Sequence, residues 1–391
     1  MVDDVLCVAE CSSEAVQSVA TINAFMELKK LKLAAKKCGK IHVGRKIGDC
    51  PEYKIHEDKL QESKSEKYLG DYISEKETLD ETIEPRKLKG YAYISEIRAL
   101  LSDMPFRHRR VQVGLMLRDA MFVSGILLNL EVWHSMTKEH IEQLEIMDRS
   151  LLKYIVKAHS KVQNEFIYLE MGIFNVGQII SCRRMLYLQT ILQRGDEEIT
   201  KKMYDAQKKS PLEGDWFKLV SEDFEKLGLD LNETSIKNCT KNQCKVLVKT
   251  SLRNHMFSEL KTVQTGHSQI KSIKYPTFNT QEYLKTHMMN NHEVSLLFAL
   301  RSKTVKGFKV TFPFNAGHMC PMFGKEEDTQ EHCIQCEVTY PEDTRDFDIK
   351  YCDIFSEDVK KQTAITKRFQ YFFREGRMPV PPILASPFSR L

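Results

Sequence analysis

Apolar residues recur at intervals of three and four through most of this chain, and this periodicity is the feature that most limits its fold. Ser356 to Asp358 precede another such segment, which presents Ile365, Phe369, Phe372 and Phe373. Patterns typical of strands lie mainly before residue 79, and Phe347 to Ile354 predict a loop or a short strand. The chain therefore predicts an α+β fold that is mostly helical. Glycines and prolines divide its central part into candidate helices at 79–101, 111–130, 137–156, 162–170, 176–193, 196–208, 215–227, 241–262 and 280–302.

The N-terminus carries two adjacent carboxylates, Asp3 and Asp4, directly before the apolar run Val5 to Ala9. This order predicts a tight hairpin with the acids at its tip and a buried strand leaving it. Carboxylate pairs can hold Mg²⁺, although two acids near a terminus can also simply be solvated. A helix from about Ser12 to Leu33 follows, and strands are expected over 36–44 and 68–74.

Composition places the chain among ordinary globular proteins, with 42% hydrophobic and 29% charged residues. The formal net charge of +4 is compatible with a nucleic-acid partner but does not require one. Eleven cysteines, an odd number, and no secretory leader pattern indicate reduced thiols in an intracellular protein, cytoplasmic or nuclear. Arg118 and Asp119 interrupt the longest apolar run, so we expect no membrane segment.

Two basic segments are candidates for nucleic-acid contact. Arg107, Arg109 and Arg110 precede the apolar run that begins at residue 111. The second segment alternates cations with apolar residues, and it reads either as a solvated helix face or as a surface that tracks phosphates. Its cations are Lys241, Lys245, Lys249, Arg253, Lys261, Lys271 and Lys274.

The order of the N-terminal motifs resembles the second half of the palm of non-LTR retrotransposon reverse transcriptases. The motifs are Val2-Asp3-Asp4, a helix, Lys37-Cys38 on a strand, and Tyr68-Leu69-Gly70. The resemblance implies that Asp3 and Asp4 bind catalytic Mg²⁺, that Lys37 lies beside the nucleotide, and that Tyr68, Leu69 and Gly70 support the primer end. The helices between 79 and 156 look like the thumb of these polymerases.

Residues 320–336 resemble the zinc knuckle that follows the thumb in many such elements. Cys320, His332 and Cys336 occupy three of its ligand positions, but Phe323 stands at the fourth. Structural zinc requires four N or S ligands. Either His318 or Cys333 supplies the fourth ligand to Zn²⁺, or the segment is a relic loop without metal.

The resemblance implies five segments and a truncated polymerase. They are a partial palm (1–78), a thumb-like bundle (79–160), a helical extension (161–303), a knuckle-like segment (304–345) and a C-terminal helix with a Pro-rich tail (346–391). The fingers and the palm half that carries the third acid are absent from this sequence, so we expect no polymerase activity from this chain alone, with residual nucleic-acid binding. Two alternatives stay open: a helical interaction scaffold, and a longer active gene product. No pattern indicates an oligomeric state.

Overall fold

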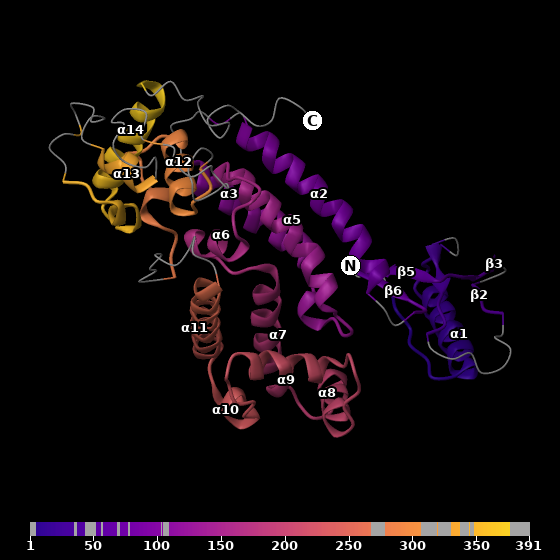
Figure 1. Ribbon diagram of the computed structural model, residues 1–391. Helices are drawn as coiled ribbons and strands as arrows, with labels where there is room; N and C mark the ends of the chain where they lie inside the picture. Colours follow the sequence, from indigo (N-terminus) through magenta and orange to yellow (C-terminus); the bar gives the residue numbers. More distant parts are fainter. Residues whose placement is uncertain are drawn as a thin grey trace. The chain divides into compact units, whose positions relative to one another are not determined.

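The computed structural model confirms a mostly helical α+β chain with a few small sheets (Figure 1). It divides into two compact units, which we describe separately: Met1–Leu88 with Ser135–His140, and Lys89–His134 with Ile141–Leu391. For Leu260, 263–266, Cys333 and 372–375 only the backbone is described. The described residues are 5–34, 37–43, 52–55, 58–68, 71–76, 79–102, 104, 109–266, 278–305, 319, 330–336, 344 and 348–375.

Among its described residues, the first unit contains α1 (Ser12–Leu28), three two-stranded sheets and the first turns of the helix that begins at Asp80. β1 (Gly39–Lys40) pairs in parallel with β4 (Gln61–Glu62), whereas β2 (Lys54–Ile55) and β3 (Asp58–Lys59) are antiparallel. β5 (Ser65–Tyr68) and β6 (Asp71–Ser74) form an antiparallel hairpin. The expected single strand over 68–74 is therefore wrong, because Tyr68 pairs with Asp71 on the neighbouring strand.

The predicted buried strand after the Asp pair is also wrong. Val5 to Ala9 belong to no strand, and the side chains of Val5, Leu6 and Val8 are exposed. α1 has the predicted apolar spacing, yet none of its residues is buried. The strands described in this unit are two to four residues long, and Ile55 of β2 is the one buried residue among them. They therefore offer α1 little apolar surface on which to bury its own apolar side.

The β5–β6 hairpin is joined to the first turns of α2 (Asp80–Ser102) by side-chain contacts. The buried Arg86 guanidinium forms an ion pair with Asp71. The Thr82 hydroxyl donates to the Tyr72 carbonyl at 3.1 Å. A proline is best tolerated in the first turn of a helix, which is where we expected Pro85, but it is the sixth residue of α2 and lies in the second turn.

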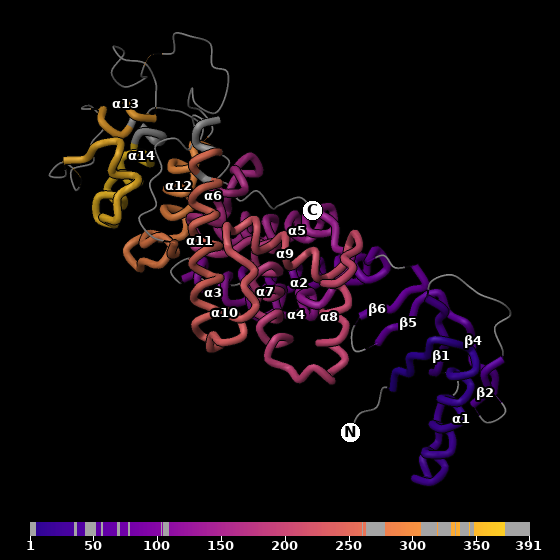
Figure 2. The backbone as a smooth tube through the Cα atoms, turned by 90° about the horizontal axis from the view of Figure 1, so that it is seen from below, coloured from indigo at the N-terminus to yellow at the C-terminus, as the bar shows by residue number. Residues whose placement is uncertain are grey.

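The second unit is built from helices, which Figure 2 shows as a tube in sequence colours. The predicted helix at 280–302 is shorter than expected: Asn290 caps α12, and only a 3₁₀ turn at Glu282–Leu284 precedes it. The helices are α3 (Arg110–Leu117), α4 (Ser124–Ile126), α5 (Lys138–Val156), α6 (Asn164–Met171), α7 (Val176–Leu192), α8 (Ile199–Lys209), α9 (Trp216–Lys226), α10 (Glu233–Asn238), α11 (Lys241–Gly266), α12 (Asn291–Arg301), α13 (Gln330–Gln335) and α14 (Val359–Glu375), with 3₁₀ turns at Leu130–Val132 and Tyr351–Phe355.

The expected helix over 111–130 contains a π-helical stretch, Arg118–Val123, between α3 and α4. Arg118 stands at its first position, and its side chain is 2% exposed. The guanidinium donates from Nε and Nη2 to the two oxygens of Asp148 on α5, at 2.6 and 2.7 Å. The Tyr168 hydroxyl on α6 donates to the same carboxylate at 3.2 Å. This network connects three helical segments through one buried ion pair.

A second buried ion pair connects α6 to α12. Glu170 and Arg301 are both fully buried, and Nη2 of Arg301 donates to Oε1 of Glu170 at 2.7 Å. The Tyr283 hydroxyl donates to Oε2 of Glu170 at 2.7 Å. Nη1 of Arg301 donates to the Ile354 carbonyl at 2.5 Å. Burial raises the pKa of the Tyr283 hydroxyl well above its ordinary value, with the Glu170 charge acting in the same direction.

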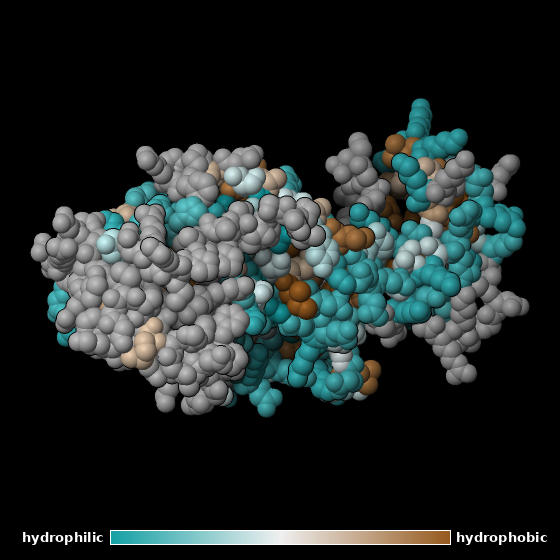
Figure 3. Space-filling view, turned by 45° about the horizontal axis from the view of Figure 1, so that its top comes forward, coloured by the Kyte–Doolittle hydropathy of each residue, from teal (hydrophilic) through white to brown (hydrophobic). Residues whose placement is uncertain are grey.

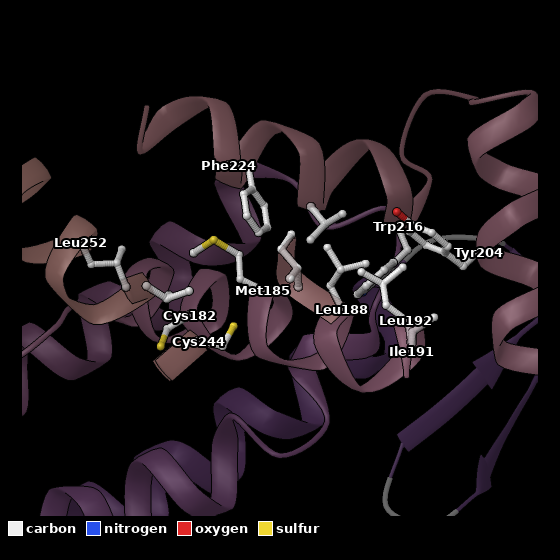
Figure 4. Packing of buried hydrophobic residues seen from close by; sticks show 13 residues of the cluster. Cys182, Met185, Leu188, Ile191, Leu192, Tyr204, Trp216, Phe224, Cys244 and Leu252 are labelled. Atoms are coloured by element: carbon white, nitrogen blue, oxygen red, sulfur yellow. The ribbon is translucent and has the colours of Figure 1, made fainter. Parts of the chain in front are cut away.

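The hydrophobic core around α7 fixes the position of α11 (Figure 4). Cys182, Met185 and Leu188 of α7 pack with Trp216 and Phe224 of α9, among others. The Trp216 indole N–H donates to the Glu131 carbonyl at 2.6 Å, so its polar atom is satisfied. From α11, Cys244, Val248 and Leu252 enter the same cluster.

Apolar side chains at the surface are scattered. On the face in Figure 3 the described residues are mostly hydrophilic, and the apolar ones form separate small groups. None of the helices in the described ranges is both long and apolar enough to cross a membrane.

Candidate nucleic-acid interface

α11 carries five of the cations that the sequence predicts to contact nucleic acid. Thr240 caps its start: Oγ1 accepts from the Gln243 N–H at 3.3 Å, and Oε1 of Gln243 accepts from the Thr240 N–H at 2.9 Å. Residues four apart on one side of the helix are buried, namely Cys244, Val248, Leu252 and Met256. The remaining sides of α11 are available to carry charge.

Immediately beside this buried stripe runs a row of cations that we call the cationic ridge: Lys241, Lys245, Lys249 and Arg253. Lys241, Lys245 and Arg253 are exposed, and Lys249 is half-buried. Within the part of the chain that the structure describes, no carboxylate forms an ion pair with these side chains. The ridge is therefore a run of positive charge that the described protein does not neutralise.

The ridge is unfavourable for α11 itself. Like charges four residues apart on a helix cost about 0.2–0.5 kcal/mol per pair. Lys241 also lies in the first turn, which contains no acidic residue, and a cation there opposes the helix dipole. An anion bound along the ridge would relieve both effects.

Arg183 on α7 is a further cation next to the α7–α11 contact, and the sequence patterns gave it no role. It follows Cys182, which packs against α11, and burial raises the pKa of that thiol, while the charges of Lys249, Lys245 and Arg183 act to lower it. Arg183 is half-buried and donates to the Leu127 carbonyl, so we do not count it in the ridge.

Arg253 ends the ridge against an aromatic ring. Its guanidinium carbon lies 5.9 Å from the centroid of Phe278, a cation–π distance. Phe257 packs edge-on against the same ring, with centroids 6.4 Å apart. Of the other lysines predicted in this segment, Lys261 is exposed, and Lys271 and Lys274 lie outside the described residues.

The basic segment predicted before the apolar helix at 111–130 is arranged differently from the ridge. Arg110 is buried, and its guanidinium donates to the carbonyls of Leu101, Tyr154 and Ile155 at 2.6, 3.3 and 3.0 Å. Those carbonyls end two helices, so Arg110 acts there as a cap. Arg109 is exposed and contacts Nε2 of His287 at 2.9 Å. Arg107 lies outside the described residues.

The residues that the polymerase resemblance makes catalytic are only partly described. Asp3, Asp4, Leu69 and Gly70 lie outside the described residues. Lys37 is exposed and precedes β1 instead of lying on it, which corrects the expected strand over 36–44. Tyr68 is half-buried at the end of β5.

Of the predicted zinc ligands, His332 and Cys336 are four residues apart on α13 and just after it, and Cys336 is buried. Cys320 and His318 lie outside the described residues, as does the Cys333 side chain. No three His, Cys, Asp or Glu side chains in the described ranges could hold a metal together. A complete zinc site would thus need ligands from residues that the structure does not describe.

A small pocket of about 140 Å³ in the second unit carries the opposite charge. Burial raises the pKa of Glu145 in its wall, although the Gly177 N–H and Arg149 act against that shift. The carboxylates would repel phosphate, so this pocket is not part of a nucleic-acid surface. Its charged lining consists of Glu142, Glu145, Glu165, Glu259 and Arg149.

Comparisons of this chain with protein-family models, with curated proteins and with solved structures found no match in any of the three.

Proposed function

We propose that this chain derives from a non-LTR retrotransposon reverse transcriptase, that it has no polymerase activity by itself, and that it retains nucleic-acid binding. The order of the Asp pair, the Tyr-Leu-Gly segment, the helical region and the Cys-His-Cys segment supports this origin. A palm needs three metal-binding acids to stabilise attacking and leaving oxygens together, and Asp3 and Asp4 supply two.

The observation that carries the binding proposal is the cationic ridge. Its four cations have no carboxylate partner among the described residues, although 54 acidic residues are present in the chain. Phosphates are the most common polyanion that such a surface meets in a cell, and their neutralisation by Lys and Arg supplies most sequence-independent affinity.

Fluorescence anisotropy with the full chain and labelled DNA and RNA at low salt tests this proposal. We expect dissociation constants of about 10⁻⁴ to 10⁻⁶ M near physiological salt, with tighter binding as salt is removed. Absence of binding to every probe at low salt would contradict it. Primer extension on an RNA template with Mg²⁺ should give no product.

A second function, a helical interaction scaffold, is favoured by one observation. α1 buries none of its residues, and its apolar side chains Val16, Phe25 and Leu28 are exposed. A scaffold without a nucleic-acid role would bind no probe in the anisotropy test and would lose its partners when these side chains are changed to polar ones.

Zinc and cellular location complete the proposal. We infer an intracellular protein, because eleven cysteines remain reduced most readily inside the cell. Zinc content of purified protein, measured by mass spectrometry, tests the knuckle. One equivalent that Cys336→Ser removes would assign a metal site to the segment, and no zinc would support the relic loop.

A further inference from the structure

The geometry of α11 points to a specific mode of binding, which rests on the function proposed above. We propose that the cationic ridge binds double-stranded nucleic acid through backbone phosphates alone, without sequence preference. The duplex lies along the side of α11 that carries the ridge, and the bases are not read.

The length of the ridge fits a short stretch of duplex. Lys241 and Arg253 are twelve residues apart on one helix, which corresponds to roughly 18 Å along its axis. That length covers about five base pairs. Successive ridge residues rise by roughly 6 Å each, so several phosphates of one strand can be contacted in turn.

The side chains between the cations argue for backbone contact. Proteins that hold single strands combine positive charge with exposed aromatic rings on which bases stack. The one Phe, Tyr or Trp of α11 is Phe257, which is half-buried and packs against Phe278. Without a stacking platform on α11, the affinity must come from phosphates, and a duplex presents these at the highest density.

The rigidity of the ridge has a structural basis. α11 is fixed to α7 by the buried side chains Cys244, Val248 and Leu252, so its cations are held in a line before any ligand arrives. Gln189 of α7 donates to the Cys239 carbonyl, and Gln193 donates to the Lys237 carbonyl at 3.2 Å, which secures the chain leading into α11. A preorganised surface loses little entropy on binding.

Exposed apolar residues next to the ridge, Val246 and Leu247, would also suit an acidic amphipathic peptide. The ridge residues are spaced for a regular polyanion, whereas two neighbouring apolar side chains make a small anchor. We therefore assign the surface to nucleic acid, and competition by an acidic polypeptide becomes one outcome of the test.

The experiment compares two triple variants of the full chain with equal loss of charge. The ridge variant is Lys241→Gln, Lys245→Gln and Lys249→Gln. The control is Lys202→Gln, Lys208→Gln and Lys218→Gln. Lys202 and Lys208 are exposed, Lys218 is half-buried, and the three lysines are paired with Glu197, Glu233 and Glu213. Circular dichroism and thermal unfolding confirm that both variants are folded.

The measurement is anisotropy with a mixed-sequence duplex of about 20 base pairs, and with each of its single strands, between about 50 and 200 mM salt. Each lost phosphate contact lowers the slope of log K against log salt by about 0.9 and weakens binding near 0.1 M salt by about eightfold. In the ridge variant the magnitude of the slope of log K against log salt should fall by about 2.7, and in the control it should not change.

Four outcomes decide between the proposals. Loss of slope in the ridge variant alone, equal for duplexes of different sequence, supports the inference. Tight binding that neither variant changes overturns the inference and leaves the proposed function in place. Stronger binding to single strands than to duplex, or displacement by polyglutamate as effective as by DNA, also overturns it. No binding by the unmodified chain overturns both.

Discussion

Two sets of cations in the second unit behave in opposite ways. Arg118 and Arg301 are buried, and each meets a carboxylate with several hydrogen bonds. The cations of the ridge lie outside the core and have no carboxylate partner among the described residues. The two sets do not differ simply as arginines and lysines, because the ridge also contains an arginine, Arg253.

The difference shows how burial determines what a charge contributes. A buried cation needs a matched anion or, as at Arg110, several carbonyl oxygens. Arg118 and Arg301 are matched by carboxylates from other helices and so fix which helices meet. A cation in water loses little without a partner, so the ridge can remain unpaired until an external anion arrives. Changes at the buried pairs should therefore alter stability, and changes at the ridge should alter binding.

The largest expected effect follows from Glu170→Gln. This change leaves the Arg301 guanidinium buried without its counter-charge, and breaking a buried pair in this way costs about 3–5 kcal/mol. The free energy of unfolding from urea titrations measures the loss. The double variant Glu170→Leu with Arg301→Met should recover much of it, because no buried charge remains. A double variant as unstable as the sum of both single changes would show that the pair itself is not the cause.

A smaller effect is expected from Tyr168→Phe. The hydroxyl donates to the buried Asp148 carboxylate at 3.2 Å, and a hydrogen bond to a charged group contributes about 1.5–3 kcal/mol. Tyr187→Phe is the matched control. The Tyr187 ring is half-buried on α7, but its hydroxyl forms no hydrogen bond to a carboxylate among the described residues. Equal losses for the two variants would argue against the Asp148 network.

The pH dependence of stability tests the role of Glu145. This partly buried carboxylate is intermediate between the fully buried ion pairs and the cations of the ridge. Burial raises the pKa of its folded form above the unfolded value of about 4.3. A raised folded pKa gives stability that is present below the unfolded pKa and is lost as the pH rises through the folded one. Urea titrations across this range should show the advantage of the unmodified chain over Glu145→Gln shrinking as the pH increases. The exposed Glu225→Gln should leave the profile unchanged, and a rising advantage would reverse the sign of our argument.

The smallest expected effect is on the stability of ridge variants. Lys245→Gln removes two like-charge contacts on α11, so unfolding free energy should stay constant or increase by about 0.2–0.5 kcal/mol per contact. The same urea titrations measure it, with Lys208→Gln as the control that breaks an exposed ion pair at 2.6 Å. A loss above about 1 kcal/mol would mean that Lys245 has a structural partner.

Helical periodicity predicted the second unit better than the first. The stripe predicted for the helix at 137–156 is buried at Leu144, Met147, Leu151 and Ile155, and Thr137 accepts from the His140 N–H as its cap. The same spacing in α1 leaves every residue unburied. In α2 the apolar spacing predicts one buried side made of Ile83, Leu88, Tyr91, Ile94, Ile97 and Leu101. Four of these residues are buried, but Leu88 and Tyr91 are 71% and 55% exposed. Helical periodicity shows that a helix has an apolar side, but the element that packs against it determines whether that side is buried.

The sequence alone determined the mostly helical class, most helix positions and the cationic spacing of α11, because these depend on residues near one another in the chain. Tertiary structure decided which cations remain available. Arg110 was predicted to meet phosphate, but it donates to three carbonyls up to 45 residues away, whereas Lys241, Lys245 and Arg253 remain exposed. Pairing and burial depend on which distant residues meet in space, and no local pattern records that.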